Sequence, residues 1–551
     1  MSENTFIRLK PFSHGPVDLI NLGRTSMSVI GRTRLRCLAM AAAAAVVVAG
    51  CGASGTDESA TQGADANAGA AVNSVLKFTS SAPIQNLDPV THVPGNYPYL
   101  ALTYDRLLML DADDNIIPGL ATDWSFAEDG SHLQLKLRQD VTFHDGTPFN
   151  AEAVKINIER GQTQTDSTIK ADLKDITDVE IVDDHTVNLK LEKGTGVALP
   201  SVLTTQSGMM VSPKAIADGV DLKKNPGKAG SGPYIITEFV PNEKVVVKKA
   251  DSYWDPNAGK LAGIELERVP DATTRLKGVQ TGQTDLSFVS SANDVVQAEQ
   301  LAKTGALRQS TTTFRNVLGV LLRADQGDLA KPEVRQAIAH AIDPKQIVAL
   351  FSGKCAPTRS LYPAKSVWAD PSYAYPYEYD PAKAKELVKS VGGAKVSISF
   401  ASATNTEQPA NVILAAMKDA GINAELNPVP NSELEPRFIA GDFQLEVTNT
   451  FNPRIDPAST VDQYFLNGYR LATDAKLIEK TAAKAADPRL DEKTRVPMYH
   501  DLWKTALEQV WFIPLCNMTN AAIYNDKVVG AERVPWANLG LWDLRGVAKT
   551  K

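Results

Sequence analysis

Three apolar segments that alternate with two helical segments, between residues 396 and 447, constrain the fold of this chain more than any other feature. Each apolar segment has hydrophobic side chains at every second position, which is typical of β-strands. Strands that alternate with helices along a chain form a parallel sheet covered by helices. We therefore predict an α/β lobe here, with strands marked by Val396, Ile398 and Phe400, by Ile422, Ala424 and Leu426, and by Phe443, Leu445 and Val447, and with helices over 411–420 and 432–440.

Local patterns predict further strands and helices, so the whole chain is expected to be mixed α and β. Asn150, Asp343 and Asp380 suit helix N-caps, and Pro332 suits a first helical position. We expect the helix after Asn150 to end at Gly161. Antiparallel strand pairs are predicted for 133–137 with 141–143, for 179–181 with 187–191, and for 234–240 with 245–247.

The N-terminal segment has the features of a secretory leader with a lipid-attachment cysteine. Arg32, Arg34 and Arg36 precede an uncharged stretch over 38–50, and Cys51 follows it. This stretch is too short to cross a hydrocarbon core about 30 Å thick, which takes about 20 helical residues. We expect translation to begin at Met27, residues 1–50 to be removed as a signal peptide, and lipid on Cys51 to anchor the exported protein to the outer face of the cell membrane.

Composition divides the remainder into a tether and a large globular part. Residues 51–74 carry almost no apolar side chain, so we predict a disordered tether. The chain from Val75 onward is too long for one hydrophobic core, and two or three domains are expected. The net charge of −7 disfavours nucleic-acid partners, whose phosphates require Lys and Arg.

The chain contains a series of separated blocks, at 118–124, 129–130, 135–138, 143–151, 230–234, 251–254, 282–285 and 334–338. In this order they resemble the extracellular solute-binding proteins of ABC importers, the family of dipeptide, oligopeptide and nickel binders. The residue types in these blocks indicate structural roles, not catalysis or ligand binding. Asp129-Gly130 and Asp145-Gly146 suit tight turns that need a left-handed backbone. His144 is expected to be structural, and the glycine loop at 230–233 lacks the lysine of a phosphate-binding loop.

The resemblance implies a two-lobed α/β fold of the type II periplasmic-binding-protein class, with a hinge and an extra subdomain on the first lobe. A monomer of this kind captures a small solute between its lobes and delivers it to an ABC permease and ATPase complex. By analogy lobe I comprises 75–105, 228–312 and 510–551, its subdomain 106–227, and lobe II 313–509, with the hinge near Thr312 and Gln509. An exported location permits Cys355 and Cys516 to form a disulfide, but we expect two separately buried thiols, because a bridge across a moving cleft would lock it.

No catalytic pattern emerges from the sequence. It contains no His-Glu-x-x-His zinc pattern, no Gly-x-Ser-x-Gly elbow and no Cys-x-x-Cys pair. The acidic doublets Asp113-Asp114 and Asp183-Asp184 lie in predicted turns, where solvated side chains are expected. We therefore expect no enzymatic activity, no cofactor and no directly bound metal. An extracellular hydrolase is the minor alternative, and a sensor without a transport role is another.

One segment of the predicted second lobe gives information about the type of ligand. Peptide binders of the family look like Trp-x-x-Asp-Tyr-x-Asp-Pro here, and the first Asp pairs with the α-amino group of the peptide. This chain has Pro453 at that position, then Arg454, and it retains Asp456-Pro457. Either another carboxylate such as Asp456 meets the amine, or the solute is not an ordinary peptide and Arg454 meets an anionic group. An Arg454 that simply points to solvent is an equal alternative.

Aromatic and amide side chains supply the other candidate ligand contacts, because tyrosine combines a large contact area with a polar tip. Each is equally explained by packing. Arg315 and Arg359 are weaker candidates for pairing a ligand carboxylate. We predict a peptide or peptide-like solute, with a nickel chelate, an opine or an oligosaccharide as alternatives. The remaining candidates are Asn96, Tyr97, Tyr99, Tyr104, Phe451, Asn452 and Asn517.

Overall fold

The computed structural model describes residues 74–92, 96–402, 404–534, 536–537 and 541–550. The chain divides into two units, Met1–Gln62 and Gly63–Lys551, and all described residues belong to the second. The predicted signal peptide over 1–50, the predicted lipid site Cys51 and the predicted tether up to residue 73 lie outside the described residues.

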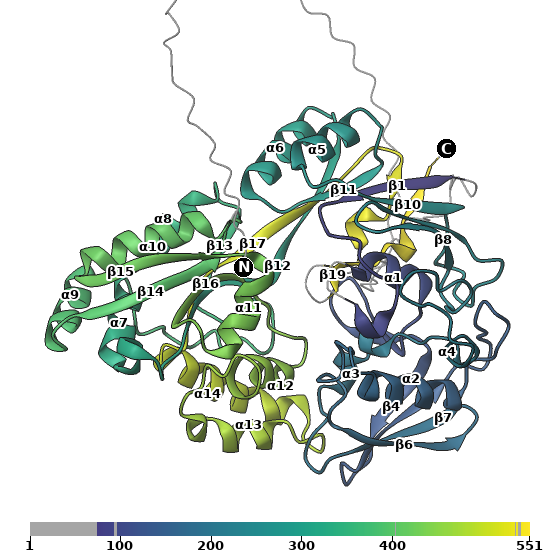
Figure 1. Ribbon diagram of the computed structural model, residues 1–551, viewed down its shortest axis with the longest axis horizontal. Helices are drawn as coiled ribbons and strands as arrows, with labels where there is room; N and C mark the ends of the chain where they lie inside the picture. Colours follow the sequence, from purple (N-terminus) through teal and green to yellow (C-terminus); the bar gives the residue numbers. More distant parts are fainter. Residues whose placement is uncertain (1–73, 93–95, 403, 535, 538–540, 551) are drawn as a thin grey trace, which may run out of the picture. The chain divides into compact units, whose positions relative to one another are not determined.

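One mixed sheet of eleven strands forms the centre of the described unit (Figure 1). The three strands predicted between 396 and 447 are confirmed, and they pair in parallel as expected. In spatial order the strands are β15 (Ile422–Val429), β14 (Ala394–Ala401), β16 (Leu445–Phe451), β12 (Arg308–Leu322), β17 (Phe512–Tyr524), β11 (Leu286–Val289), β1 (Val75–Ser80), β10 (Gly263–Arg268), β9 (Lys244–Lys249) and β8 (Tyr234–Val240), with β13 (Cys355–Pro357) beside β17.

The predicted helix starts are confirmed. The Asn150 side chain accepts a hydrogen bond from the Ala153 backbone N–H, and Asp343 and Asp380 cap their helices in the same way. The longer helices are α2 (Ala151–Thr163), α5 (Ala272–Gln280), α6 (Ala292–Lys303), α7 (Pro332–Ala341), α8 (Pro344–Leu350), α9 (Pro381–Ser390), α10 (Glu407–Asp419), α11 (Asn431–Ala440), α13 (Glu479–Ala485) and α14 (Glu492–Glu508); shorter ones are α1 (Tyr97–Thr103), α3 (Leu199–Val202), α4 (Pro213–Ala217) and α12 (Pro457–Thr460).

Gly161 does not end α2, contrary to the prediction. It lies inside the helix, where a Cβ atom would approach Leu173 Cδ1 to 2.7 Å and Ile169 Cδ1 to 3.0 Å. A glycine is therefore needed at this position for close packing and not for a left-handed cap.

A separate four-stranded antiparallel sheet has the order β4 (Ala121–Phe126), β5 (His132–Leu137), β7 (Thr186–Leu191), β6 (Ile176–Asp183), and a small hairpin, β2 (Leu108–Leu110) with β3 (Ile116–Pro118), precedes it. The predicted pairs 179–181 with 187–191 and 234–240 with 245–247 are confirmed. The predicted pairing of 133–137 with 141–143 is wrong. Both edges of β5 are occupied by β4 and β7, so no edge remains, and Thr142 forms a bridge with Pro148 instead.

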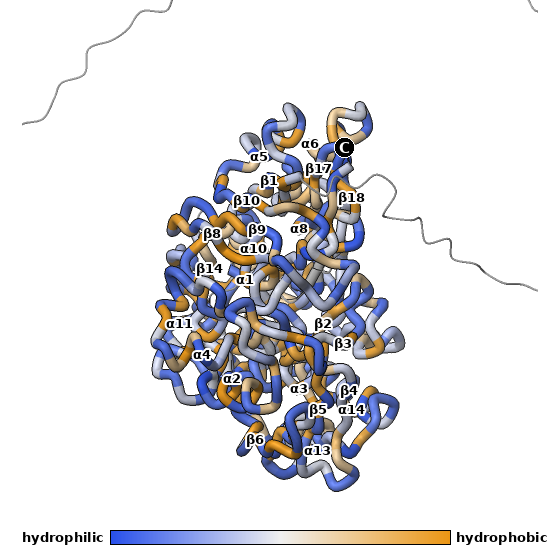
Figure 2. Tube along the Cα trace, turned by 90° about the vertical axis from the view of Figure 1, so that its right-hand side faces the viewer, coloured by the Kyte–Doolittle hydropathy of each residue, from blue (hydrophilic) through white to orange (hydrophobic). Residues whose placement is uncertain are grey.

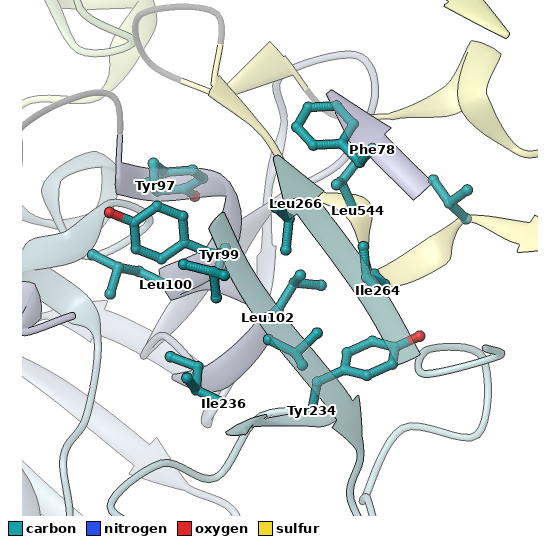
Figure 3. Packing of buried hydrophobic residues seen from close by; sticks show 14 of the residues in the cluster. Phe78, Tyr97, Tyr99, Leu100, Leu102, Tyr234, Ile236, Ile264, Leu266 and Leu544 are labelled. Atoms are coloured by element: carbon teal, nitrogen blue, oxygen red, sulfur yellow. The ribbon is translucent and has the colours of Figure 1, made fainter. Parts of the chain in front are cut away.

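Separate buried clusters stabilise the different parts of the unit. The first cluster packs α1 against β1, β8, β9 and β10, and Figure 3 shows Tyr97 and Tyr99 among these side chains. The four-stranded sheet and α2 enclose another cluster. Around β12, β14 and β16, a second cluster contains residues of α7 to α10, and a third contains residues of α11, α13 and α14. The limits of the lobes themselves stay a prediction.

The strands β12 and β17 are long enough to contribute to several of these clusters. Thr313 pairs with Thr519 and Val317 pairs with Asn517, so residues 314–316 form a bulge opposite Met518. Before the bulge β12 packs with α6, and after it β12 pairs with β16 as well. The register places Asn520 opposite Thr312, at the first predicted crossing. Gln509, at the second predicted crossing, caps the C-terminus of α14 just before β17.

Cys355 and Cys516 form a disulfide, which corrects the expectation of two separate thiols. Their Cα atoms are 5.3 Å apart, within the usual range for a bridge. The expectation assumed that the cysteines face each other across a cleft. In fact β13 pairs directly with β17, and both cysteines belong to the second cluster, so the bridge joins neighbouring strands of one core.

Among the described residues, no helix combines the length and apolar character that crossing a membrane requires. In Figure 2 hydrophilic and hydrophobic stretches interchange along the whole coloured trace.

Candidate functional site

Two candidates, Phe451 of the predicted lobe II and Asn517 of the predicted lobe I, lie where β16 ends beside the β12 bulge. Phe451, the last residue of β16, pairs with Val317, and Val317 pairs with Asn517 on β17. The Asn517 side-chain amide donates to the backbone carbonyls of Arg315 and Asn316, at 3.3 and 3.2 Å. The register therefore brings Phe451 and Asn517 close together through Val317, but both are buried and have structural partners.

The segment 452–456 follows β16, and its backbone is held by side chains from elsewhere in the chain. The Asn452 N–H donates to the Tyr464 hydroxyl at 2.8 Å, and the Arg454 N–H donates to Thr460 Oγ1 at 2.8 Å. The Tyr362 hydroxyl donates to the Arg454 carbonyl at 3.0 Å. These bonds fix the path of the segment independently of the Arg454 side chain.

Asp456 is already paired. Arg495 Nη2 donates to both carboxylate oxygens, at 2.7 and 2.8 Å, and the Ala458 N–H donates to Oδ1 at 2.9 Å, which caps α12. The side chains of Arg495 and Asp456 are only 6% and 12% exposed. Releasing this carboxylate would leave a buried guanidinium without its counter-ion, which is strongly unfavourable. The role of Asp456 in this structure is to cap a helix and to neutralise Arg495.

Arg454 differs from Asp456 because no carboxylate neutralises it. Its Nε donates to Gln463 Oε1 at 3.0 Å, and no Asp or Glu oxygen among the described residues lies within 4.0 Å of its guanidinium. The two other candidate arginines are engaged elsewhere. Arg315 forms an ion pair with Asp114 at 2.6 Å, and Arg359 donates to the Pro514 carbonyl at 3.3 Å and lies over the Tyr375 ring.

The first-lobe candidates come from α1 and its ends. Tyr97, Tyr99 and Tyr104 belong to the first cluster, and Figure 3 shows Tyr97 and Tyr99 within it. The Tyr97 hydroxyl accepts a hydrogen bond from Arg106, and the Tyr99 hydroxyl donates to the Asn86 carbonyl at 3.1 Å. Burial raises the pKa of both tyrosines. Asn96 and Tyr104 are also fully buried, although Asn96 Nδ2 and the Tyr104 hydroxyl have no hydrogen-bond partner among the described residues.

Ile455 connects the two groups of candidates. It lies between Arg454 and Asp456, and its side chain packs against the first cluster, which contains Tyr97. A second contact of this kind is the ion pair between Lys174 and Asp462, at 2.7 Å, which joins the predicted subdomain to the segment after α12. The loop 452–456 therefore lies at a junction between the predicted lobes.

Sequence reasoning missed a buried ionic network behind α1. Arg106 and Arg545 both pair with Asp543, and Arg545 also reaches Asp105 at 3.2 Å. Burial by itself would raise the pKa of Asp543, but Arg545 and Arg106 bring it well below its ordinary value. The sequence did contain one signal, the adjacent charges Asp105 and Arg106 within the apolar residues 99–110. Their partners lie more than 400 positions away, so no local sequence pattern could predict the pairing.

A second missed feature is Glu446, a carboxyl on β16 that is 1% exposed. The pKa of Glu446 is raised from 4.5 to about 7, mainly by burial. A hydrogen bond with Thr448 lowers this pKa, and the nearby Glu435 raises it further. Glu446 follows Leu445 in a strand whose other side chains are apolar or neutral, so the sequence pattern alone predicted a plain core strand.

We expect Glu446→Gln to stabilise the protein at pH 8 by about 3 kcal/mol and to change little at pH 4. Between its ordinary pKa of 4.5 and about 7, the folded protein keeps a proton on Glu446 that the unfolded chain has released. Stability therefore falls as pH rises through this window, and glutamine removes that loss. Urea unfolding at several pH values measures it. Glu433→Gln, on exposed α11, is the matched control, and an unchanged pH slope in Glu446→Gln would contradict the prediction.

The signature blocks are scaffold, as predicted. The His144 ring lies 2.8 Å from the Gly232 carbonyl oxygen, and Gly130 and Gly146 have φ values of 71° and 87°. At Gly230 and Gly232 a Cβ would come within 2.1 Å of the Thr103 oxygen and within 2.6 Å of the Leu102 oxygen. The glycine loop thus lets the end of α1 approach closely.

Within the described ranges, no three His, Cys, Asp or Glu side chains gather closely enough to hold a metal ion.

Residues 115–470 match the family described as bacterial extracellular solute-binding proteins, family 5, middle region. The chain belongs to this family. One similar curated protein is the glutathione-binding protein GsiB of Salmonella typhi, 32% identical over 292 residues, which are 52% of this chain and 56% of the relative. The chain therefore spans only about half the length of the curated relatives it matches.

Solved structures agree with the fold. NikA from Brucella suis in complex with Fe(III)-EDTA is 22% identical, with a TM-score of 0.74 over 87% of this chain and 100% of that one. DppA from Helicobacter pylori in complex with the peptide STSA is 23% identical, with a TM-score of 0.73 over 87% and 98%. The two-lobed periplasmic-binding-protein fold predicted from the sequence is confirmed.

Proposed function

We propose that this protein is the solute-binding component of an ABC import system, which captures a peptide or peptide-like small molecule between its lobes and delivers it unaltered to the permease and ATPase. Family membership supports solute binding, and the glutathione-binding relative supports a small peptide-like solute. The observation that carries the proposal is the segment 452–456, which lies at a junction between the predicted lobes and presents an un-neutralised Arg454.

The proposed hinge is the β12 bulge with the part of β17 opposite it. Extra residues on one strand absorb changes of backbone angle while both strands keep their pairing on either side. Of the predicted site residues, Arg454 and Asn452 are proposed to contact the solute because both lie in the segment 452–456. Asn452 is buried like the other candidates, but its Nδ2 has no acceptor among the described residues. The buried Asn96, Tyr97, Tyr104, Phe451 and Asn517 are proposed to support the walls of the cleft, and Asp456 to fix the loop.

We further propose that the protein acts as a monomer held at the outer face of the membrane by lipid on Cys51. The basic leader, the short apolar stretch and the cysteine that follows support this attachment. Mass spectrometry of the mature N-terminus tests it, because an unmodified Cys51 in the exported protein would contradict lipid anchoring.

The function is tested by thermal and chemical unfolding of the purified protein with candidate solutes. A solute that binds only the folded state stabilises it by about 2.7 kcal/mol when present at a hundredfold excess over its Kd. We expect glutathione or other short peptides to stabilise the protein, and a nickel–histidine chelate, an opine and an oligosaccharide to have no effect. Stabilisation by one of these three alone would contradict a peptide-like solute, and turnover of any compound would indicate an enzyme.

A further inference from the structure

We propose that the cargo is recognised through an anionic group, read by Arg454 with Asn452, and that a free amine on the cargo contributes little. This inference rests on the proposed function and specifies its class of solute: short peptides or peptide-like acids whose carboxylate is free, whether or not their amino group is blocked.

The first argument is the state of the carboxylates around the segment. A cargo ammonium needs a carboxylate without a partner. Asp456 is held by Arg495 through both oxygens. Asp114, which faces the β12 bulge, is held by Arg315 at 2.6 Å, and Asp462, two residues after α12, is held by Lys174 at 2.7 Å. Each of these three acids already has a cationic partner, so an ammonium that binds at any of the three would have to displace that partner.

The second argument is the state of the donors on the same segment. Among the described residues, Arg454 donates only through Nε, to a neutral amide, which leaves both terminal guanidinium nitrogens without an acceptor. Asn452 is 3% exposed, and its Nδ2 has no acceptor in the described part of the chain. A buried donor without an acceptor is unfavourable. A cargo carboxylate supplies acceptors for both side chains, and guanidinium binds carboxylate in a paired geometry.

The third argument is that this site is formed before the cargo arrives. The backbone at Asn452 and Arg454 is fixed by Tyr464, Thr460 and Tyr362, and Gln463 orients the guanidinium through Nε. Binding a carboxylate therefore orders few additional groups, which favours affinity. The positive charge of Arg454 acts against an ammonium at the same place.

The test uses three forms of the same compounds, measured by isothermal titration calorimetry on the purified protein. The compounds are glutathione and pooled tripeptides, each as the free form, as the N-acetyl form and with esterified or amidated carboxylates. We expect N-acetylation to change the affinity less than threefold and loss of the carboxylates to reduce it at least tenfold. An affinity that falls tenfold on N-acetylation but survives loss of the carboxylates would overturn the inference and leave the proposed function intact. Failure of every form to bind would contradict the peptide-like solute and the inference together.

Variants test the residue assignment. Arg454→Gln is expected to reduce affinity for the free acids at least tenfold and to abolish the difference between acid and amide forms. Arg454→Lys retains the charge but not the paired geometry, and should lie between the two. Arg437→Gln, on α11, removes an arginine whose partners are Glu433 and Asp442 and serves as the control, with no change in affinity. An Arg454→Gln protein that still discriminates acid from amide would overturn the assignment.

Discussion

Replacing Cys355 and Cys516 together by alanine is expected to lower the free energy of unfolding by about 4 kcal/mol. The disulfide closes a loop spanning 161 positions of sequence, so it removes much conformational freedom from the unfolded chain. Both cysteines are fully buried in the second cluster, and alanine also leaves that cluster less well filled. Urea unfolding of the oxidised protein and of the double variant measures the difference.

Solute affinity provides the control for this prediction. The bridge joins β13 to β17 within one core, so its loss should leave binding unchanged under conditions in which the variant is folded. A reducing agent present throughout refolding should reproduce the effect in the unmodified protein and have no effect on the variant. A loss below 1 kcal/mol would show that the two cysteines are not bonded in solution.

The second large effect is expected at the ionic network behind α1. Asp543→Asn should lower the free energy of unfolding by about 4 kcal/mol, because two buried guanidinium groups lose their shared carboxylate. In the unmodified protein the pKa of Asp543 lies well below its ordinary value of 3.8. The ionised carboxylate therefore stabilises the fold fully above pH 3.8, and this stabilisation is lost as the pH falls below 3.8 toward the lowered pKa. The variant should therefore show a weaker loss of stability between pH 4 and pH 2.

The exposed Asp526, next to the end of β17, gives the matched control for this measurement. Asp526→Asn is expected to change stability by less than about 0.5 kcal/mol, as is usual for surface positions. Equal effects of the two substitutions would show that the network contributes nothing specific. An Asp543→Asn protein with unchanged acid sensitivity would contradict the assigned pKa direction.

Much of the fold was predictable because its signals are local. Alternation at 396–400 and 422–426 identified neighbouring parallel strands, and caps such as Asn150 and Asp343 marked helix starts within a residue. The predictions that were wrong depended on contacts with segments outside the local pattern. The pairing of 141–143 depended on which strands already occupied β5, and the role of Gly161 depended on Leu173 and Ile169 packing against it.

The candidate site was predictable in part. The segment around Arg454 could be identified only from its resemblance to a motif of the family's peptide binders. The sequence left open whether Asp456 was available to a ligand, because Arg495 lies 39 positions away. The tyrosines of α1 were plausible ligand contacts by residue type. Every residue of that short helix is buried, however, and its aromatic rings fill the first cluster. Residue type predicts chemistry, whereas burial decides whether that chemistry faces a ligand.

The way the loop 452–456 is anchored has a consequence for how such receptors diversify. Its course is set by bonds from Tyr362, Thr460 and Tyr464 to backbone atoms, and none of these bonds involves the side chain at position 454. A substitution at position 454 can therefore exchange the cation for a neutral or acidic group without removing any of these backbone bonds. If Arg454 reads the cargo as proposed, an exchange at this one position alters the solute preference while the path of the loop stays the same.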